Sequence, residues 1–104
     1  ADYDAALKRD PKNAAALNAR AMLLMQTKSY AKAADDLDRV IQLEPKNPQA
    51  YYQRGLAREQ VEQFDKAIAD YKLALAHDGN MSDARQALTR AAMADERTAR
   101  RSSR

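Results

Sequence analysis

The sequence repeats itself with a period of 34 residues, and this period constrains the fold more than any other feature. Pro11 aligns with Pro45 and Gly79, and Arg20 aligns with Arg54. The other matches at this shift are Tyr3, Leu37 and Tyr71; Leu7, Ile41 and Leu75; Asp2, Asp36 and Asp70; Ala16, Ala50 and Ala84; Tyr30 and Phe64; and Ala33 and Ala67. Such agreement at one shift is not expected by chance, even in an Ala-rich chain. Periods of about 20–50 residues indicate an architecture of stacked repeats.

Each repeat is predicted to hold two helices joined by short turns. The segments 10–13 and 44–47 combine Pro with Asn, and 78–80 reads Asp-Gly-Asn, all of which favour turns. With only two Gly and three Pro in 104 residues, the composition favours helices over a β-sandwich or barrel. In residues 48–81 the apolar positions recur at helical spacing, namely Tyr51, Gly55 and Val61, then Ala67, Ile68, Tyr71, Ala74 and Leu75 after Phe64 at the turn.

These positions resemble the tetratricopeptide repeat (TPR). Residues 48–81 supply Tyr51, Gly55, Ala67 and Tyr71 of the family pattern, and depart from it at Arg54, Arg58 and Gly79. Residues 14–47 supply Leu17, Ala21, Leu24, Ala33, Leu37 and Pro45. The small residues of this pattern let two helices approach closely where they cross. The resemblance implies an all-α fold, a right-handed α-α superhelix of antiparallel helix pairs with about six helices.

The repeat boundaries suggest one TPR-like domain over residues 1–96. Residues 1–13 match the second helix of a truncated repeat, 14–47 and 48–81 are repeats, and 82–96 read as a capping helix with a polar outer face. Residues 97–104 hold four Arg and no acid, so we expect a flexible basic tail there.

The resemblance implies a protein–protein interaction scaffold that binds a peptide or protein segment in its concave groove. In such folds the first helix of each pair lines the concave side. The groove positions carried over are Asn18, Met22, Met25, Gln26, Gln49, Tyr52, Leu56, Glu59, Gln60, Gln86 and Arg90. Some TPR domains clamp a terminal carboxylate with Lys and Asn, but Asn18 and Met22 occupy those positions here, so chaperone-tail binding is not expected.

Self-association is the alternative hypothesis. Tyr3, Ala6 and Leu7 would normally pack on a preceding helix, so an exposed N-terminal helix edge favours a homodimer or another oligomer of this chain.

Neither an enzyme nor a cofactor or metal site is predicted. The chain has no Cys and no Gly-rich phosphate loop, and its serines have no His partner nearby. The single His77 is interpreted as a residue of a helix C-terminus, and Asp35, Asp36 and Asp38 as a solvated face, not as metal ligands.

The charge distribution also limits the partners. The net charge is +3, but outside residues 97–104 the chain carries 14 basic and 15 acidic residues. A nearly neutral body with a basic tail free of aromatic residues does not predict nucleic-acid binding. No segment is apolar enough for a membrane span and no signal peptide is recognised, so the sequence leaves the native compartment open.

Overall fold

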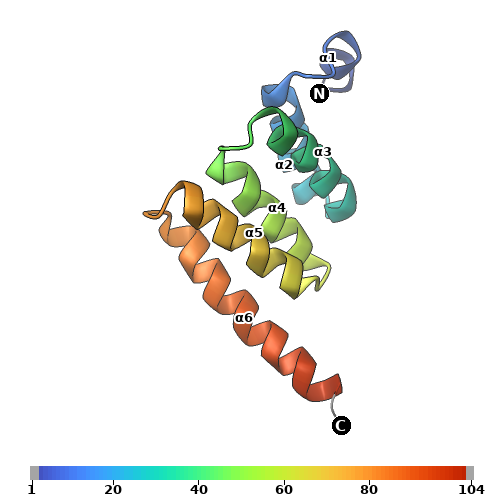
Figure 1. Ribbon diagram of the computed structural model, residues 1–104. Helices are drawn as coiled ribbons and strands as arrows, with labels where there is room; N and C mark the ends of the chain where they lie inside the picture. Colours follow the sequence, from blue (N-terminus) through green and yellow to red (C-terminus); the bar gives the residue numbers. More distant parts are fainter. Residues whose placement is uncertain (1–2, 103–104) are drawn as a thin grey trace.

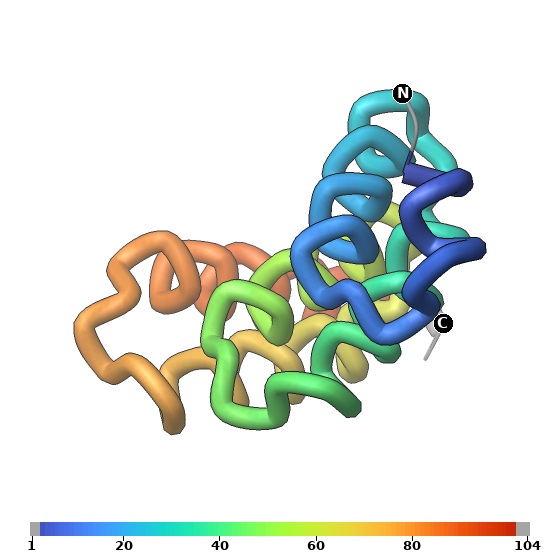
Figure 2. Tube along the Cα trace, turned by 90° about the horizontal axis from the view of Figure 1, so that it is seen from above, coloured from blue at the N-terminus to red at the C-terminus, as the bar shows by residue number. Residues whose placement is uncertain are grey.

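The computed structural model describes residues 3–102, and these form six α-helices and no strand. Each helix packs against the next in the chain, and Figure 1 shows the resulting stack. The stack is elongated, with extents of 51 × 28 × 18 Å, and Figure 2 shows that it bends between its two ends. The predicted all-α fold of paired helices is confirmed. The helices are α1 (Tyr3–Arg9), α2 (Ala14–Gln26), α3 (Tyr30–Leu43), α4 (Pro48–Gln60), α5 (Phe64–His77) and α6 (Ser82–Ser102).

Asparagine side chains set the start of two helices that are 34 residues apart. The Asn13 Oδ1 atom accepts from the backbone N–H of Ala16 at 3.1 Å, and Asn47 Oδ1 accepts from that of Gln49 at 3.0 Å. These bonds satisfy N–H groups that have no partner inside the helix. Pro48 occupies the first turn of α4, where its missing N–H costs nothing.

The turn inside each helix pair depends on a residue in the left-handed conformation. Lys28 and Glu62, again 34 residues apart, have φ angles of 64° and 62°. The next residue then donates back to the preceding helix, from Ser29 N–H to the Leu24 carbonyl at 2.8 Å and from Gln63 N–H to the Arg58 carbonyl at 2.9 Å. This closes the helix end and reverses the chain.

The crossing of α4 and α5 depends on a glycine facing a tyrosine ring. A Cβ atom added to Gly55 would lie only 2.5 Å from Cε1 of Tyr71, whose side chain is fully buried. In the first repeat the aligned residues are Ala21 and Leu37, which are buried in one cluster with Ala33. The small residue and its bulky neighbour therefore change together between the repeats, as close packing requires.

Arg54 of α4 joins three helices, because it binds one carboxylate on α3 and one on α5. Its guanidinium donates to Asp70 of α5 through Nε and Nη2, the latter at 2.7 Å, and to Asp38 of α3 through Nη1 at 2.8 Å. Arg58 donates to the other oxygen of Asp70 at 2.9 Å. Burial on its own would lower the pKa of Arg54, but the bonds with Asp70 and Asp38 raise it above its ordinary value.

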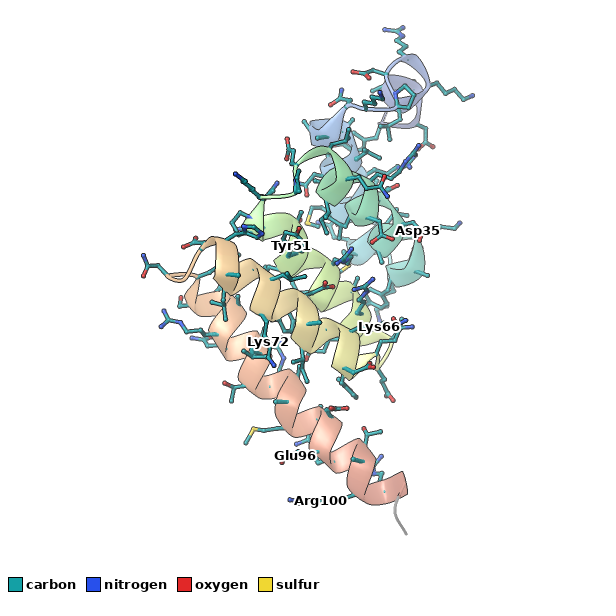
Figure 3. All side chains as sticks on the ribbon, viewed as in Figure 1. Asp35, Tyr51, Lys66, Lys72, Glu96 and Arg100 are labelled. Carbon is teal, nitrogen blue, oxygen red and sulfur yellow. The ribbon has the colours of Figure 1, made fainter. Side chains whose placement is uncertain are left out.

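Arg20 repeats this arrangement one repeat earlier. It donates to Asp36 of α3 at 2.6 and 2.8 Å and to Asp4 of α1 at 3.1 Å. We call the set Arg20, Arg54, Arg58, Asp4, Asp36, Asp38 and Asp70 the Arg–Asp network. The prediction that Asp36 belongs to a solvated face was wrong, because Asp36 is buried and its carboxylate is bound by Arg20. The Asp38 side chain is bound by Arg54 but remains 42% exposed. Asp35, labelled in Figure 3, is exposed.

The predicted flexible tail is helical as far as the structure describes it. Helix α6 continues to Ser102, past the end expected at residue 96. No Gly or Pro interrupts it, Ala94 is buried, and the Thr98 hydroxyl donates to the Ala94 carbonyl at 3.1 Å. Residues 1 and 2 of the predicted N-terminal helix, and residues 103 and 104 of the tail, lie outside the described part.

The Gly55–Tyr71 crossing yields the first prediction. Gly55→Ala should destabilise the fold by roughly 1–2 kcal/mol in urea unfolding followed by circular dichroism. The 2.5 Å approach places the overpacking cost in the upper part of its usual range, about 2–3 kcal/mol, and the helix preference of Ala over Gly recovers roughly 1 kcal/mol of it. In a Tyr71→Leu background the cost should disappear, since Ala21 and Leu37 form that pair in the first repeat.

The control for this prediction is the other glycine. A Cβ added to Gly79 would have only a backbone oxygen at 3.8 Å nearby, so Gly79→Ala should change stability by less than about 0.5 kcal/mol. An equal cost of Gly55→Ala with Tyr71 and with Leu at position 71 would contradict the proposed packing constraint.

Candidate functional site

The candidate site lies on the first helices of the pairs, α2, α4 and α6. Helix α6 packs on both α4 and α5, which brings Tyr52 and Leu56 of α4 beside α6. Both side chains are half-buried and pack against a buried cluster of α5 and α6 that includes Ala87 and Ala91. The ring centres of Tyr52 and Tyr71 are 5.9 Å apart and the rings are tilted by 45°. Two of the predicted groove residues thus form a partly apolar floor between α4 and α6.

A charged pair lies beside this floor. Arg90 of α6 donates to both carboxylate oxygens of Glu59 of α4, at 2.7 and 2.8 Å. The Tyr71 hydroxyl donates to the same carboxylate at 2.6 Å. The Glu59 side chain is only 12% exposed, whereas that of Arg90 is 54% exposed. Two predicted groove residues therefore bind each other, and the arginine still faces solvent.

The surroundings shift the pKa values of these groups. Burial alone would raise the pKa of Glu59, but the hydrogen bonds from Arg90 and Tyr71 outweigh it and hold the pKa below its ordinary value. Burial, and after it the nearby Asp83 carboxylate, raises the pKa of Tyr52. Glu59 is therefore ionised and Tyr52 is a neutral hydroxyl at neutral pH. Such groups can bind and orient a ligand by hydrogen bonds and apolar contact.

The α2 part of the predicted groove is more apolar. Met22 and Met25 are half-buried against Ala21, Ala33 and Leu37 of the first repeat, and Asn18 is half-buried as well. The remaining groove residues are exposed, namely Gln26, Gln49, Gln60 and Gln86. Within residues 3–102, no hydrogen bond or ion pair joins the groove residues of α2 to those of α4 and α6.

The surface of α1 differs from the sequence prediction. Leu7 is buried with Ala16, Leu17 and Val40, so it cannot offer an exposed contact, although Tyr3 is 37% exposed. Leu7 turns inward because α1 packs on α2.

Leu23, which sequence reasoning missed, is 45% exposed. The residues aligned with it are Ala57 and Ala91, which are buried. The change from alanine to leucine at this position is the sequence signal that could have identified it. Tyr3, Ala19, Met22, Leu23 and Gln26 line a surface hollow of about 280 Å³, and we call these five residues the N-terminal edge.

Sequence reasoning also missed how the aromatic residues beside the groove are held. The Tyr51 hydroxyl donates to the Pro45 carbonyl at 2.7 Å, and its ring stacks on that of His77 with centres 5.4 Å apart. His77 lies in the last turn of α5. These two contacts hold the side chain of Tyr51, which is labelled in Figure 3 and directly precedes the groove residue Tyr52 in the chain.

Two features are absent from the described residues. These residues contain no group of three or more His, Cys, Asp or Glu side chains placed to hold a metal ion. None of the described helices combines the length and the apolar character that crossing a bilayer requires.

The Glu59–Arg90 pair yields a prediction about stability. Glu59→Gln keeps the size but removes the charge, and should cost about 1–2 kcal/mol of unfolding free energy at pH 7. Because the folded-state pKa of Glu59 is lowered, its contribution is present above the unfolded pKa of about 4.3 and is lost as the pH falls through the folded value. The difference in unfolding free energy between the wild type and Glu59→Gln should therefore shrink below about pH 4.

The matched control is Glu62→Gln, which removes the same charge from an exposed residue. It should change stability by less than about 0.5 kcal/mol at pH 7. A Glu59→Gln cost that stays constant down to pH 2 would show that the charge of Glu59 is not what stabilises the fold.

A family model described as tetratricopeptide repeat matches residues 20–94, which is more than half of the chain. The search of curated proteins found no match.

Several solved TPR domains are similar to most of this chain. One is the first TPR of Spaghetti (RPAP3) bound to the HSP90 peptide SRMEEVD, with 27% identity, a TM-score of 0.85, and coverage of 88% of this chain and 73% of that one. Another is the Arabidopsis OM64 TPR domain, with 29% identity, a TM-score of 0.82, and coverage of 86% and 74%. A third is the second TPR domain of human RPAP3 in complex with an HSP70 peptide, with 25% identity, a TM-score of 0.82, and coverage of 86% and 74%. Fold, repeat spacing and family match agree, and the chain belongs to the tetratricopeptide repeat family.

Proposed function

We propose that this chain is a binding module, not an enzyme, and that it holds a peptide segment of another protein on the face formed by α2, α4 and α6. The observation that carries the proposal is the half-buried pair Tyr52 and Leu56 with the Glu59–Arg90 ion pair beside it. An aromatic ring next to partly desolvated charge is the type of surface that anchors protein ligands.

The chemistry of the groove residues suits an extended or helical peptide. Tyr52 and Leu56 offer apolar contact, and Met22 and Met25 offer flexible side chains that adapt to different shapes. The amides of Asn18, Gln49 and Gln86 can both donate to and accept from a peptide backbone. The surface therefore supports recognition by mixed contacts and not by one dominant charge.

The ligand proposed here differs from the chaperone peptides bound by the similar domains. Asn18 and Met22 stand where a clamp for a terminal carboxylate would place Lys and Asn. Arg90, the cationic groove residue of α6, is already bound by Glu59 through two bonds. We therefore propose an internal peptide segment as the ligand, and not a free acidic C-terminus.

The test selects ligands from a displayed library of random peptides on the immobilised protein and measures the best binder by fluorescence anisotropy. Tyr52→Ala and Met22→Ala should each weaken this binding by about 10-fold or more, as expected for central anchors. The peptide SRMEEVD serves as a second probe and should bind more weakly than the selected peptide.

The control is Leu73→Ala, which removes an apolar side chain that is 40% exposed on α5. It should leave the affinity within about twofold, because α5 is the second helix of its pair. Circular dichroism checks that all variants fold. Unchanged affinity in both groove variants would refute the groove assignment.

Self-association through the N-terminal edge is the second candidate, and Leu23 favours it. The aligned Ala57 and Ala91 are 1% and 0% exposed because helices cover them, whereas Leu23 is 45% exposed beside the exposed ring of Tyr3. An apolar hollow that presents a leucine at such a position is a suitable contact for a second copy of the same surface.

Sedimentation velocity at several protein concentrations checks this candidate. The wild type should shift from monomer towards dimer as concentration rises, and Leu23→Lys should remain monomeric because a buried lysine would have to be desolvated. Leu73→Lys introduces the same change on α5 and should not affect the dimer. A wild-type monomer at every concentration would reject self-association.

A further inference from the structure

Helix α6 is longer than the two helices with which it shares the candidate face. It has 21 residues, whereas α2 and α4 have 13 each. Figure 1 shows its C-terminal end extending past the other helices, and the labelled Glu96 and Arg100 in Figure 3 lie on this extension. The described residues of the expected tail, 97–102, thus belong to the same helix that packs on α4 and α5.

The helical spacing of this extension aligns three arginines. With about 100° per residue, Arg90, Arg97 and Arg101 lie within about 40° of each other around the helix axis. Arg90 is the residue that binds Glu59 at the groove, so Arg97 and Arg101 continue the same side of α6 beyond it. We call these three residues the basic stripe.

Arg97 and Arg101 differ from the other arginines near the groove in having no internal acidic partner. Arg54, Arg58 and Arg90 are all bound by carboxylates. Arg97 and Arg101 are exposed and make no hydrogen bond or ion pair with any side chain described in residues 3–101.

The two arginines share a hollow at the turn between α4 and α5. The hollow measures about 190 Å³ and is lined by Glu62, Phe64, Ala94, Arg97, Thr98 and Arg101. Phe64 and Ala94 supply apolar atoms to the lining, the Thr98 hydroxyl donates to the Ala94 carbonyl within α6, and Glu62 is the one acidic residue of the lining. Two guanidinium groups without a carboxylate partner, placed beside these apolar atoms, resemble a binding surface more than a solvated helix end.

We infer that the basic stripe binds an acidic part of an extended peptide whose remaining part lies in the groove. This inference rests on the proposed function, which places a peptide in the groove. It adds that one segment of this peptide is acidic. Arg97 and Arg101 are separated by about 6 Å along the helix axis, and alternate residues of an extended peptide by about 6.6 Å. A segment with Asp or Glu at alternate positions therefore matches their spacing, and guanidinium groups bind carboxylates with well-defined geometry.

A peptide fits the stripe better than nucleic acid or an anionic membrane. Two unpartnered arginines would release only about two counterions from a nucleic acid, which gives weak binding at physiological salt. Phe64 is half-buried in the hollow and does not offer an open face for base stacking. Stable membrane attachment needs a larger basic cluster or an additional apolar anchor.

The test uses a fluorescein-labelled twelve-residue peptide of alternating Glu and Ser, with a Gln-for-Glu peptide as its uncharged counterpart. Fluorescence anisotropy with the full chain at about 50 mM salt should detect the acidic peptide in preference to the neutral one. The double variant Arg97→Gln/Arg101→Gln should bind it roughly 3- to 30-fold more weakly. Glu62→Gln should strengthen binding, because it removes the one acid from the hollow.

The control is Arg39→Gln/Arg85→Gln, which lowers the net charge equally but at exposed residues away from the stripe. If it weakens binding as much as the stripe variant, the attraction is only general and the inference fails. Stronger binding of a single-stranded oligonucleotide or of phosphatidylserine vesicles than of the acidic peptide would also overturn it.

The outcomes separate this inference from the proposed function. If library peptides depend on Tyr52 while the acidic peptide ignores Arg97 and Arg101, the groove assignment stands and the stripe is wrong. If the acidic peptide depends on the stripe while Tyr52→Ala and Met22→Ala change nothing, the stripe binds acidic peptides but the groove assignment is wrong. Melting curves for each double variant show whether lost binding reflects lost folding.

Discussion

The fold depends on buried carboxylates that arginine holds between three helices. Asp70 is 1% exposed, and both of its oxygens accept from guanidinium groups, those of Arg54 and Arg58. A carboxylate removed from water without partners would cost several kcal/mol, so this position is stable only while the arginines remain in place. Because Arg54 also reaches Asp38, the requirement couples α4 to the helix before it and to the helix after it. The spacing of α3, α4 and α5 therefore depends on the geometry of these arginine–aspartate hydrogen bonds as well as on apolar packing.

The Arg–Asp network stops before α6, and a different interaction replaces it there. The residue of α6 aligned with Arg54 is Leu88, which packs on the apolar cluster of α5 and α6. An ion pair between Arg90 and Glu59 reaches α6 on the side of the candidate groove. The charge pair in the candidate site therefore also ties α6 to α4. This double role explains why Glu59 is nearly buried although it lies at a groove position.

The aligned positions of the three first helices separate structure from candidate function. Ala16, Ala50 and Ala84 are identical and buried, as expected where helix pairs contact each other. The groove positions differ in every helix, with Asn18 aligned to Tyr52 and Gln86, and Met22 aligned to Leu56 and Arg90. Packing restricts these contact positions to the same small residue, whereas nothing in the fold requires the same residue in the groove. The variation within this one chain is consistent with a face that is shaped for a ligand.

The sequence predicts the parts of the molecule that depend on local or periodic signals. The 34-residue period and the turns with Pro and Asn are sufficient for the helix pairs, and the small residues mark their crossings. The left-handed turn residues Lys28 and Glu62 carry no such signal, because neither is Gly or Asn. Asp36 and Asp70 were identified as repeating but not as buried, since an acidic residue is usually solvated. The sequence signal for their burial is an arginine 16 residues earlier, which repeats together with each aspartate.

The extension of α6 shows how a residue count alone can mislead. Four arginines in the last eight residues suggested a solvated tail, because like charges repel and disfavour order. Arg and Ala are nevertheless good helix formers, and Ala94 is buried where the extension begins. Once the segment is helical, the direction of each described arginine around the axis is set by its position in α6. Arg97 and Arg101 then share the side of the groove residue Arg90, so the charge that seemed separate from the candidate site becomes continuous with it.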